Sequence, residues 1–148
     1  MTKSSMRLFL MSAGSGGDTM ATFNSFAALE RQIMKDMQTA AQRSKDKIEM
    51  ELIMNVNGYY DGSTPQRYQR TGTLLTSPDS TPVQGSGKHL EFSVYMNDGI
   101  SYNTGTFSGA QVIDATERGG AGTIGNHGYF QRTEDKVESI LNSEFGKL

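Results

Sequence analysis

The sequence of 148 residues has no cysteine, no tryptophan and only three prolines. Without cysteine it can form no disulfide, cysteine-ligated zinc site or iron–sulfur cluster, and it has no thiol nucleophile, so we expect synthesis in a reducing compartment. Two histidines are too few for a histidine-rich metal site, and no Asp- or Asn-rich loop has the spacing of a calcium site. We therefore expect no metal and no cofactor, although a site made of carboxylates alone stays open.

Charge of one sign and long hydrophobic runs are also missing. The 14 Lys and Arg residues nearly balance 16 Asp and Glu residues, and no basic block suited to phosphates or anionic lipid stands out. The apolar cluster Leu8–Met11 is shorter than the apolar region of a signal peptide, about 7–15 residues, and far shorter than the ~20 residues of a membrane span. We expect a soluble protein with no membrane partner.

Strong core residues are scarce. Nine Leu, seven Ile, five Val and seven Phe make 28 of 148 residues, which is near the level at which chains become too polar to fold alone. High net charge, the usual companion of disorder, is absent. The composition therefore predicts one domain with a thin core that partners complete.

The first 20 residues differ from the rest of the chain. The apolar cluster Leu8–Met11 precedes a Gly/Ser run, Ser12–Gly17, which is flexible by composition. We expect residues 1–20 to form a flexible arm, with docking of the apolar cluster on a neighbour as the alternative. Residues 21–148 are then a single domain.

A long amphipathic helix is predicted between Phe23 and Val56, where no Pro or Gly interrupts the chain. Apolar or small residues recur there at steps of three and four: Phe26, Leu29, Ile33, Met37, Ala40, Ser44 and Ile48. Thr22, Asn24 and Ser25 are candidate N-caps. Such a helix is ~50 Å long, whereas a compact chain of this size is ~40 Å across, so the helix overhangs its own body.

The last turns of this helix carry apolar side chains in nearly every direction. They are Met50, Leu52, Ile53, Met54 and Val56. One thin protomer cannot cover all of these directions, so the helix end predicts a contact with a partner. The alternative is a strand at Ile48–Leu52, where apolar and acidic residues alternate. Gly58 is placed to end the helix.

A small antiparallel sheet is predicted in the second half of the chain. In His89–Asn97 apolar residues alternate with polar ones, as in a strand with one buried face. Asp98-Gly99 is a hairpin signal, so a return strand is expected at Ile100–Tyr102. Gln111–Ala115 is a candidate third strand, and the remainder of Gly105–Gly128 is predicted to be loop.

A short C-terminal helix is predicted from Thr133 onward. Its apolar stripe consists of Val137, Ile140, Leu141 and Phe145, and Gly146 lies where a C′ glycine would end it. Because strands and helices do not alternate along the chain, the sequence predicts an α+β fold. In this fold the long N-terminal amphipathic helix packs on a small antiparallel sheet with a short C-terminal helix.

Two glycine patterns and the two histidines are weak candidates for chemistry. Gly120–Gly125 satisfies the letters G-x-G-x-x-G, but Asn126–Gly128 does not open the helix that a dinucleotide-binding turn needs. Gly85–Lys88 lacks the first glycine and the final Ser or Thr of a phosphate-binding loop. His89 and His127 have no nucleophile or carboxylate pair arranged around them. We therefore expect no catalytic residues and no enzyme.

Aromatic and basic residues are interleaved after the long helix. Such residues are typical of protein interfaces, although they also suit a nucleic-acid backbone. Because the chain is mildly acidic, the interface is favoured. Together with the apolar helix end, the candidate interface residues are Met50, Leu52, Ile53, Met54, Tyr59, Tyr60, Arg67, Tyr68 and Arg70.

The segment Arg70–Ser77, which reads Arg-Thr-Gly-Thr-Leu-Leu-Thr-Ser, resembles the central motif of the tail completion (head–tail joining) proteins of long-tailed bacteriophages. The resemblance extends from about Phe23 to the C-terminus. The positions that match are Tyr68, Arg70, Thr71, Gly72, Leu74 and Ser77 in the central motif, Glu117, Gly119 and Gly120 in a Glu-x-Gly element, and the aromatic Phe130 before the last helix.

The resemblance implies a structural virion protein without catalytic activity. Its α+β protomers would form a homo-oligomeric ring, sixfold or twelvefold, at the neck, as a tail completion, stopper or terminator protein. The ring would join the connector or adaptor to the tail-tube proteins, and DNA would pass through the lumen without specific binding. The protein would be made in the host cytoplasm and reside in the virion.

Two other functions remain as alternatives. A nucleic-acid-binding accessory protein would use Arg67, Tyr68 and Arg70. A nucleotide-binding enzyme would use the Gly120–Gly125 loop.

Overall fold

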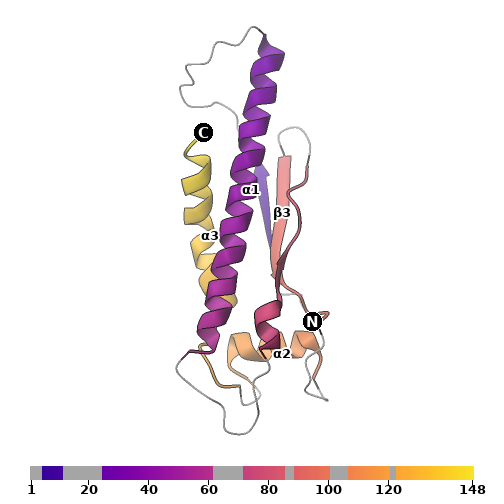
Figure 1. Cartoon of the computed structure of the whole chain (residues 1–148), viewed down its shortest axis with the longest axis vertical. Helices are drawn as coiled ribbons and strands as arrows, with labels where there is room; N and C mark the ends of the chain where they lie inside the picture. The colour runs from indigo at the N-terminus through magenta and orange to yellow at the C-terminus, as the bar shows by residue number, and fades with distance from the viewer. Residues whose placement is uncertain (1–4, 12–24, 62–71, 86–88, 101–106, 121–122) are drawn as a thin grey trace.

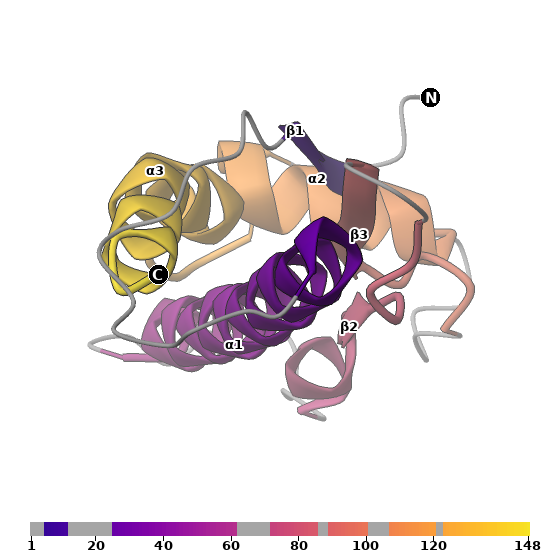
Figure 2. The same cartoon turned by 90° about the horizontal axis from the view of Figure 1, so that it is seen from above.

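The computed structural model describes residues 5–11, 25–61, 72–85, 89–100, 107–120 and 123–148. The fold is α+β, as the sequence predicts. The molecule is elongated: α1 (Phe26–Tyr59) lies between α3 (Tyr129–Phe145) and the sheet, and α2 (Gly109–Arg118) crosses the lower end (Figure 1). Seen from above, α3 and the sheet lie on different sides of α1 (Figure 2).

Helix α1 confirms the predicted long helix, shifted by three residues. Ser25 is the N-cap, because its hydroxyl oxygen accepts a hydrogen bond from the Ala28 amide at 3.1 Å. The helix continues through Gly58 and ends at Tyr59, so Gly58 does not end it. The alternative of a strand at Ile48–Leu52 is wrong, since both end residues of that segment are fully buried one helical turn apart.

The sheet has β3 (His89–Met96) at its centre, with β1 (Ser5–Met11) and β2 (Pro78–Ser80) antiparallel on either side. The predicted strand is confirmed, and its buried face packs on α1. That face consists of Leu90, Phe92, Val94 and Met96. Of the predicted return strand, Ile100 is not in a strand, and residues 101–102 lie outside the described residues.

Strand β1 lies within the segment that the sequence assigns to a flexible arm. Its register sets Leu8 opposite Phe92 and Leu10 opposite Leu90. The apolar cluster of the arm therefore pairs with the sheet of its own chain. Residues 1–4 and 12–20 of the arm lie outside the described residues.

Helix α2 corrects the predicted strand at Gln111–Ala115 and the predicted loop around it. The Ser108 hydroxyl oxygen accepts from the amide of residue 111 at 3.2 Å, and the side chain of that glutamine accepts from the Ser108 amide at 2.9 Å. This capping box starts a helix. Ile113 and Thr116 are buried on one face, and Gly119, with φ of 86°, ends the helix in the left-handed region.

Helix α3 confirms the predicted C-terminal helix but begins at Tyr129, four residues before Thr133. Gly128 precedes it with φ of 80°. Thr133 is buried within the helix, and its hydroxyl donates to the Tyr129 carbonyl at 2.9 Å. Gly146 is the C-cap in the right-handed region, so it is not the left-handed C′ glycine that the sequence predicts.

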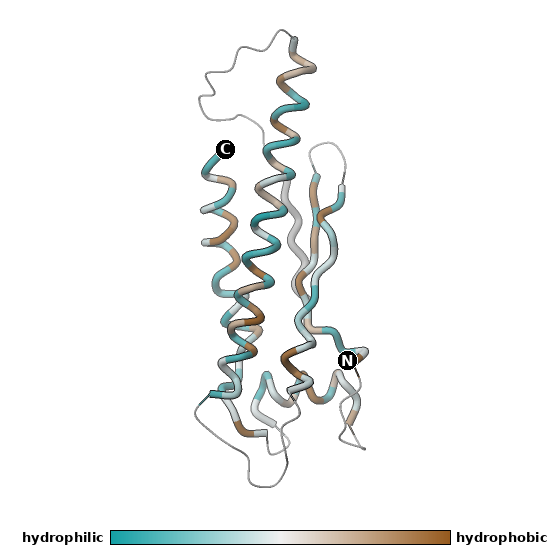
Figure 3. Tube along the Cα trace, viewed as in Figure 1, coloured by the Kyte–Doolittle hydropathy of each residue, from teal (hydrophilic) through white to brown (hydrophobic). Residues whose placement is uncertain are grey.

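The core is narrow and follows the lower part of α1. Its main cluster consists of Ile48, Leu52, Val56, Tyr59, Leu74, Phe92, Val94, Met96, Ile113, Tyr129, Phe130 and Val137. The N-terminal end of α1 projects beyond both α3 and β3 (Figure 1), and hydrophobic residues recur along this end too (Figure 3). In the part of the chain that the structure describes, no helix is long and apolar enough to cross a membrane.

Candidate interaction surface

Five of the nine predicted interface residues are either buried or outside the described residues. Arg67, Tyr68 and Arg70 lie outside the described residues. Leu52 and Tyr59 are buried in the protomer, with 0% and 3% of their surface exposed, so their prediction as interface residues is corrected. The physical reason is helical spacing, which places both side chains on the side of α1 that packs on the core.

Met50 and Met54 are the exposed members of the predicted set, at 56% and 60%. They lie one turn apart on α1, away from its core side. Ile53 and Tyr60 are partly buried. Two neighbouring apolar side chains in solvent mark a candidate contact with a partner.

A second set of exposed apolar side chains comes from η1 (Thr73–Thr76) and from the segments that flank α2, the helix that crosses the lower end of the molecule (Figure 1). Leu75 on η1, Phe107 before α2 and Ile124 between α2 and α3 are 38%, 52% and 42% exposed. We call these three residues the base surface. They come from separate segments and share no periodic spacing, so the sequence contains no signal that could group them.

The C-terminal end of α1 is held at this base by the segment before α3. The Asn126 amide donates to the Tyr59 carbonyl at 3.0 Å, and its side chain donates to the Gly58 carbonyl at 2.9 Å, which satisfies two of the last carbonyls of α1. Gly125 permits the approach, because a Cβ there would lie 2.5 Å from the Tyr59 ring and carbonyl oxygen.

The N-terminus of α3 is capped by a residue of α2. The Glu117 carboxylate accepts hydrogen bonds from the amides of Phe130 and Gln131 at 2.9 and 3.0 Å. Partial burial, with the nearby charge of Glu117, raises the pKa of Glu134. A phosphate bound at this helix N-terminus would need the same two amides, which Glu117 already occupies.

His127 contacts the end of α2, and His89 lies near a glutamate of its own strand. The Nδ1 atom of His127 is 2.7 Å from the Thr116 carbonyl oxygen, and a Cβ on Gly119 would lie 3.0 Å from the same ring. His89 is exposed, with Nε2 at 3.8 Å from Glu91 Oε2. Among the residues that can be described, no group of three His, Asp or Glu side chains is placed to hold a metal ion.

A buried carboxylate joins the middle of α1 to the C-terminal end of α3. Glu144 is 2% exposed and accepts from Lys47 of α1 and from Lys147 of its own chain end, the latter at 3.1 Å. Hydrogen bonds from these two ammonium groups lower the pKa of Glu144. The sequence pattern does not predict this pair, because its members are 97 residues apart.

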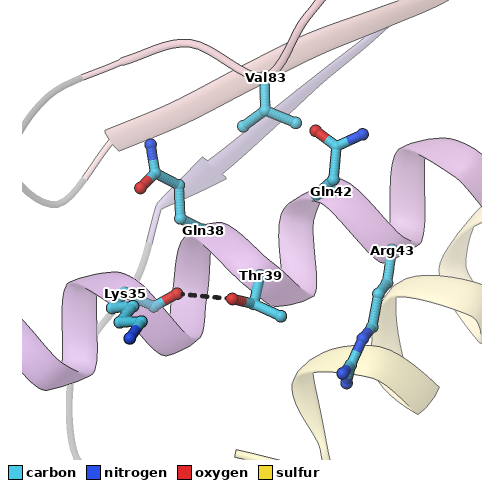
Figure 4. Close-up of a pocket in the computed structure, with 6 residues that line it drawn as sticks. All are labelled: Lys35, Gln38, Thr39, Gln42, Arg43 and Val83. Atoms are coloured by element: carbon cyan, nitrogen blue, oxygen red, sulfur yellow. Dashed lines mark hydrogen bonds between the residues drawn. The ribbon is translucent and has the colours of Figure 1, made fainter.

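A shallow groove of about 350 Å³ lies beside the middle of α1 (Figure 4). It is lined by Lys35, Gln38, Thr39, Gln42, Arg43 and Val83. In Figure 4, Gln38 and Gln42 lie near Val83, whereas Arg43 points away from it toward α3. The two cations do not converge on one point, so we assign no ligand to the groove.

Comparisons with known proteins do not identify a relative. No family model matches the sequence, and searches of curated proteins and of solved structures found no match. The function is therefore argued from the residues and their geometry alone.

Proposed function

We propose that this chain is a structural protein of a tailed-bacteriophage virion. It forms a homo-oligomeric ring at the neck that joins the connector to the tail tube and lets DNA pass. The resemblance of Arg70–Ser77 to the tail completion motif is the starting point, and the order of a long helix, a small sheet and a closing helix agrees with it. Its place is the virion, after synthesis in the host cytoplasm.

The base surface is the observation that carries this proposal. Leu75, Phe107 and Ile124 leave apolar side chains of η1 and of the two segments that flank α2 in contact with water. A ring protein needs exposed apolar side chains of this kind, because it must meet both its neighbours and the next ring along the tail axis. A thin core is expected as well, since neighbouring protomers bury surface for one another.

Hydrogen bonds between α2, α3 and the end of α1 hold the segments that carry Phe107 and Ile124 in a fixed arrangement. Glu117 ties α2 to α3, and Asn126 ties the segment before α3 to the end of α1. Surfaces that are already ordered lose less conformational freedom when they bind. The small net charge of −2 also suits a lumen through which DNA slides without being held.

Negative-stain imaging and light scattering of the purified protein test the proposal, followed by mixing with purified phage heads and tails. We expect closed rings, either free or on the particles, and joined virions. Leu75→Glu and Ile124→Glu should abolish ring formation or joining with an unchanged circular dichroism spectrum. Ser139→Glu, on the exposed side of α3, is the matched control and should have no effect. A monomer that neither forms rings nor joins heads to tails contradicts the proposal.

A further inference from the structure

The outer side of α1 carries a set of residues that the base surface does not use. They recur at steps of three, four or seven residues, and therefore lie along one side of the helix. We call this set the α1 outer face: Leu29, Asp36, Thr39, Arg43, Met50 and Met54. The last four are exposed and the first two are partly buried, and none belongs to the core cluster.

The α1 outer face has a mirror-like order of side-chain types. From the N-terminal end it is apolar, acidic, basic and apolar. Leu29 and Met50 are equally far from the Thr39–Ala40 peptide bond, and so are Asp36 and Arg43. A second copy running in the opposite direction would therefore set each apolar residue against an apolar one and each charge against its opposite.

The two charges in this pattern have no ion-pair partner among the described residues. Asp36 accepts a side-chain hydrogen bond from Gln32 at 2.8 Å, and Arg43 points toward α3 (Figure 4), so its long side chain would turn outward to meet a second copy. They are two turns apart, ~10 Å along one helix, which is too far for them to pair with each other. Across an antiparallel contact, Asp36 of each copy would face Arg43 of the other, which defines the register.

The apolar ends of the face match in the same register. Leu29 would lie opposite Met50, and Phe26, the most exposed apolar residue of the described chain at 83%, would lie close to Met54. Flexible methionine side chains fit against leucine and phenylalanine with little demand on shape.

We infer that the α1 outer face binds the same face of a second copy of this chain, antiparallel, about a two-fold axis next to Thr39. Charge complementarity of the face with itself identifies the partner, because an unrelated protein would have no reason to match this order. The contact is independent of the proposed ring. In a two-fold contact a residue near the axis meets itself, whereas around a ring the same residue never does.

A single introduced thiol tests the axis directly, since the chain has no cysteine of its own. Thr39 is exposed and is one of the residues that line the groove in Figure 4. We expect Thr39→Cys to give a covalent dimer in high yield with a short bis-maleimide. Ser139→Cys, exposed on α3, is the control and should stay monomeric on a denaturing gel. Failure of Thr39→Cys to cross-link, or equal cross-linking of both variants, overturns the inference and leaves the ring proposal untouched.

A charge swap tests the register. Asp36→Arg alone and Arg43→Asp alone each place like charges opposite one another, so dimerisation measured by sedimentation should weaken ~tenfold or more. The double variant restores both pairs and should regain the wild-type dissociation constant. Single variants that dimerise like the wild type, or a double variant weaker than both, overturn the assignment. A wild type that stays monomeric up to millimolar concentration overturns it as well.

Discussion

The two halves of α1 follow the same pattern of apolar residues but differ in what covers them. From Met37 to Tyr59 the apolar side is buried against β3 and α3, and Asn126 caps the end. From Phe26 to Asp36 no residue is buried, and this half projects beyond the rest of the molecule (Figure 1). Periodicity therefore predicts where a helix forms, whereas only the tertiary structure shows which part of its apolar side is left for a partner.

The largest expected difference is between two leucines of this one helix. Leu52→Ala should lower the free energy of unfolding by about 2–5 kcal/mol, because it opens a cavity in the core. Leu29→Ala is the matched change in the projecting half and should cost about 0.5 kcal/mol. Urea denaturation of both variants measures the two costs. Equal costs would show that the projecting half is covered within the protomer.

A glycine at the base should be nearly as sensitive. Gly125→Ala places a methyl group 2.5 Å from Tyr59 atoms at a φ of 159°, so we expect a loss of about 2 kcal/mol or more. Gly120→Ala is the control, since a Cβ there meets nothing within 4 Å. Thermal unfolding of both variants measures the two losses of stability. A tolerated Gly125→Ala would contradict the close packing of the α1 end.

Loss of the cap of α3 should lower stability more than loss of the cap at the projecting end of α1. Glu117→Ala removes the carboxylate that caps α3 and should cost about 1–2 kcal/mol, because it also separates α2 from α3. Ser25→Ala removes the cap of the projecting half and should cost about 0.5–1 kcal/mol. Glu138→Ala on the exposed side of α3 controls for loss of charge alone. The melting temperatures of the three variants measure these costs, and we expect Glu117→Ala to have the lowest. A melting temperature that is lowest for Ser25→Ala would contradict this order.

The smallest expected effect is the pH dependence of the Glu144 contact. The pKa of Glu144 is lowered in the folded protein, so its contribution to stability is present above pH 4.5, the ordinary value, and is lost as pH falls through the folded pKa. The difference in stability between the wild type and Glu144→Gln should therefore be constant near neutral pH and shrink below pH 4.5. Urea titrations at several pH values measure it. A difference that grows on acidification has the wrong sign for this contact.

Much of the fold could be predicted from local patterns. Helical steps between Phe26 and Ile48 predict α1, and alternation from Leu90 to Met96 predicts β3, because each pattern is complete within one segment. The β-branched pair Val112 and Ile113 favours a strand, but this segment forms α2. The Ser108 and Gln111 capping box is the sequence signal that predicts the helix instead.

The rest could not be predicted because it depends on residues far apart in the chain. Strand β1 pairs with a strand some 80 residues later, and Glu117 caps a helix that begins 12 residues after it. The base surface also combines three segments. The C-terminal turns of α1 are apolar on every side, so their spacing alone does not show which side faces the core. The structure buries Leu52 and leaves Met50 and Met54 exposed.

One side of α1 packs into the core of the protomer, and we expect the α1 outer face, which includes the projecting N-terminal end, to serve a second copy. Hydrogen–deuterium exchange of wild type and Met54→Glu, each at high and low protein concentration, tests it most directly. We predict slow exchange for residues 40–59 in all four samples, and slow exchange for residues 26–36 only in the concentrated wild type. Exchange in residues 26–36 that is the same in all four samples would contradict the account.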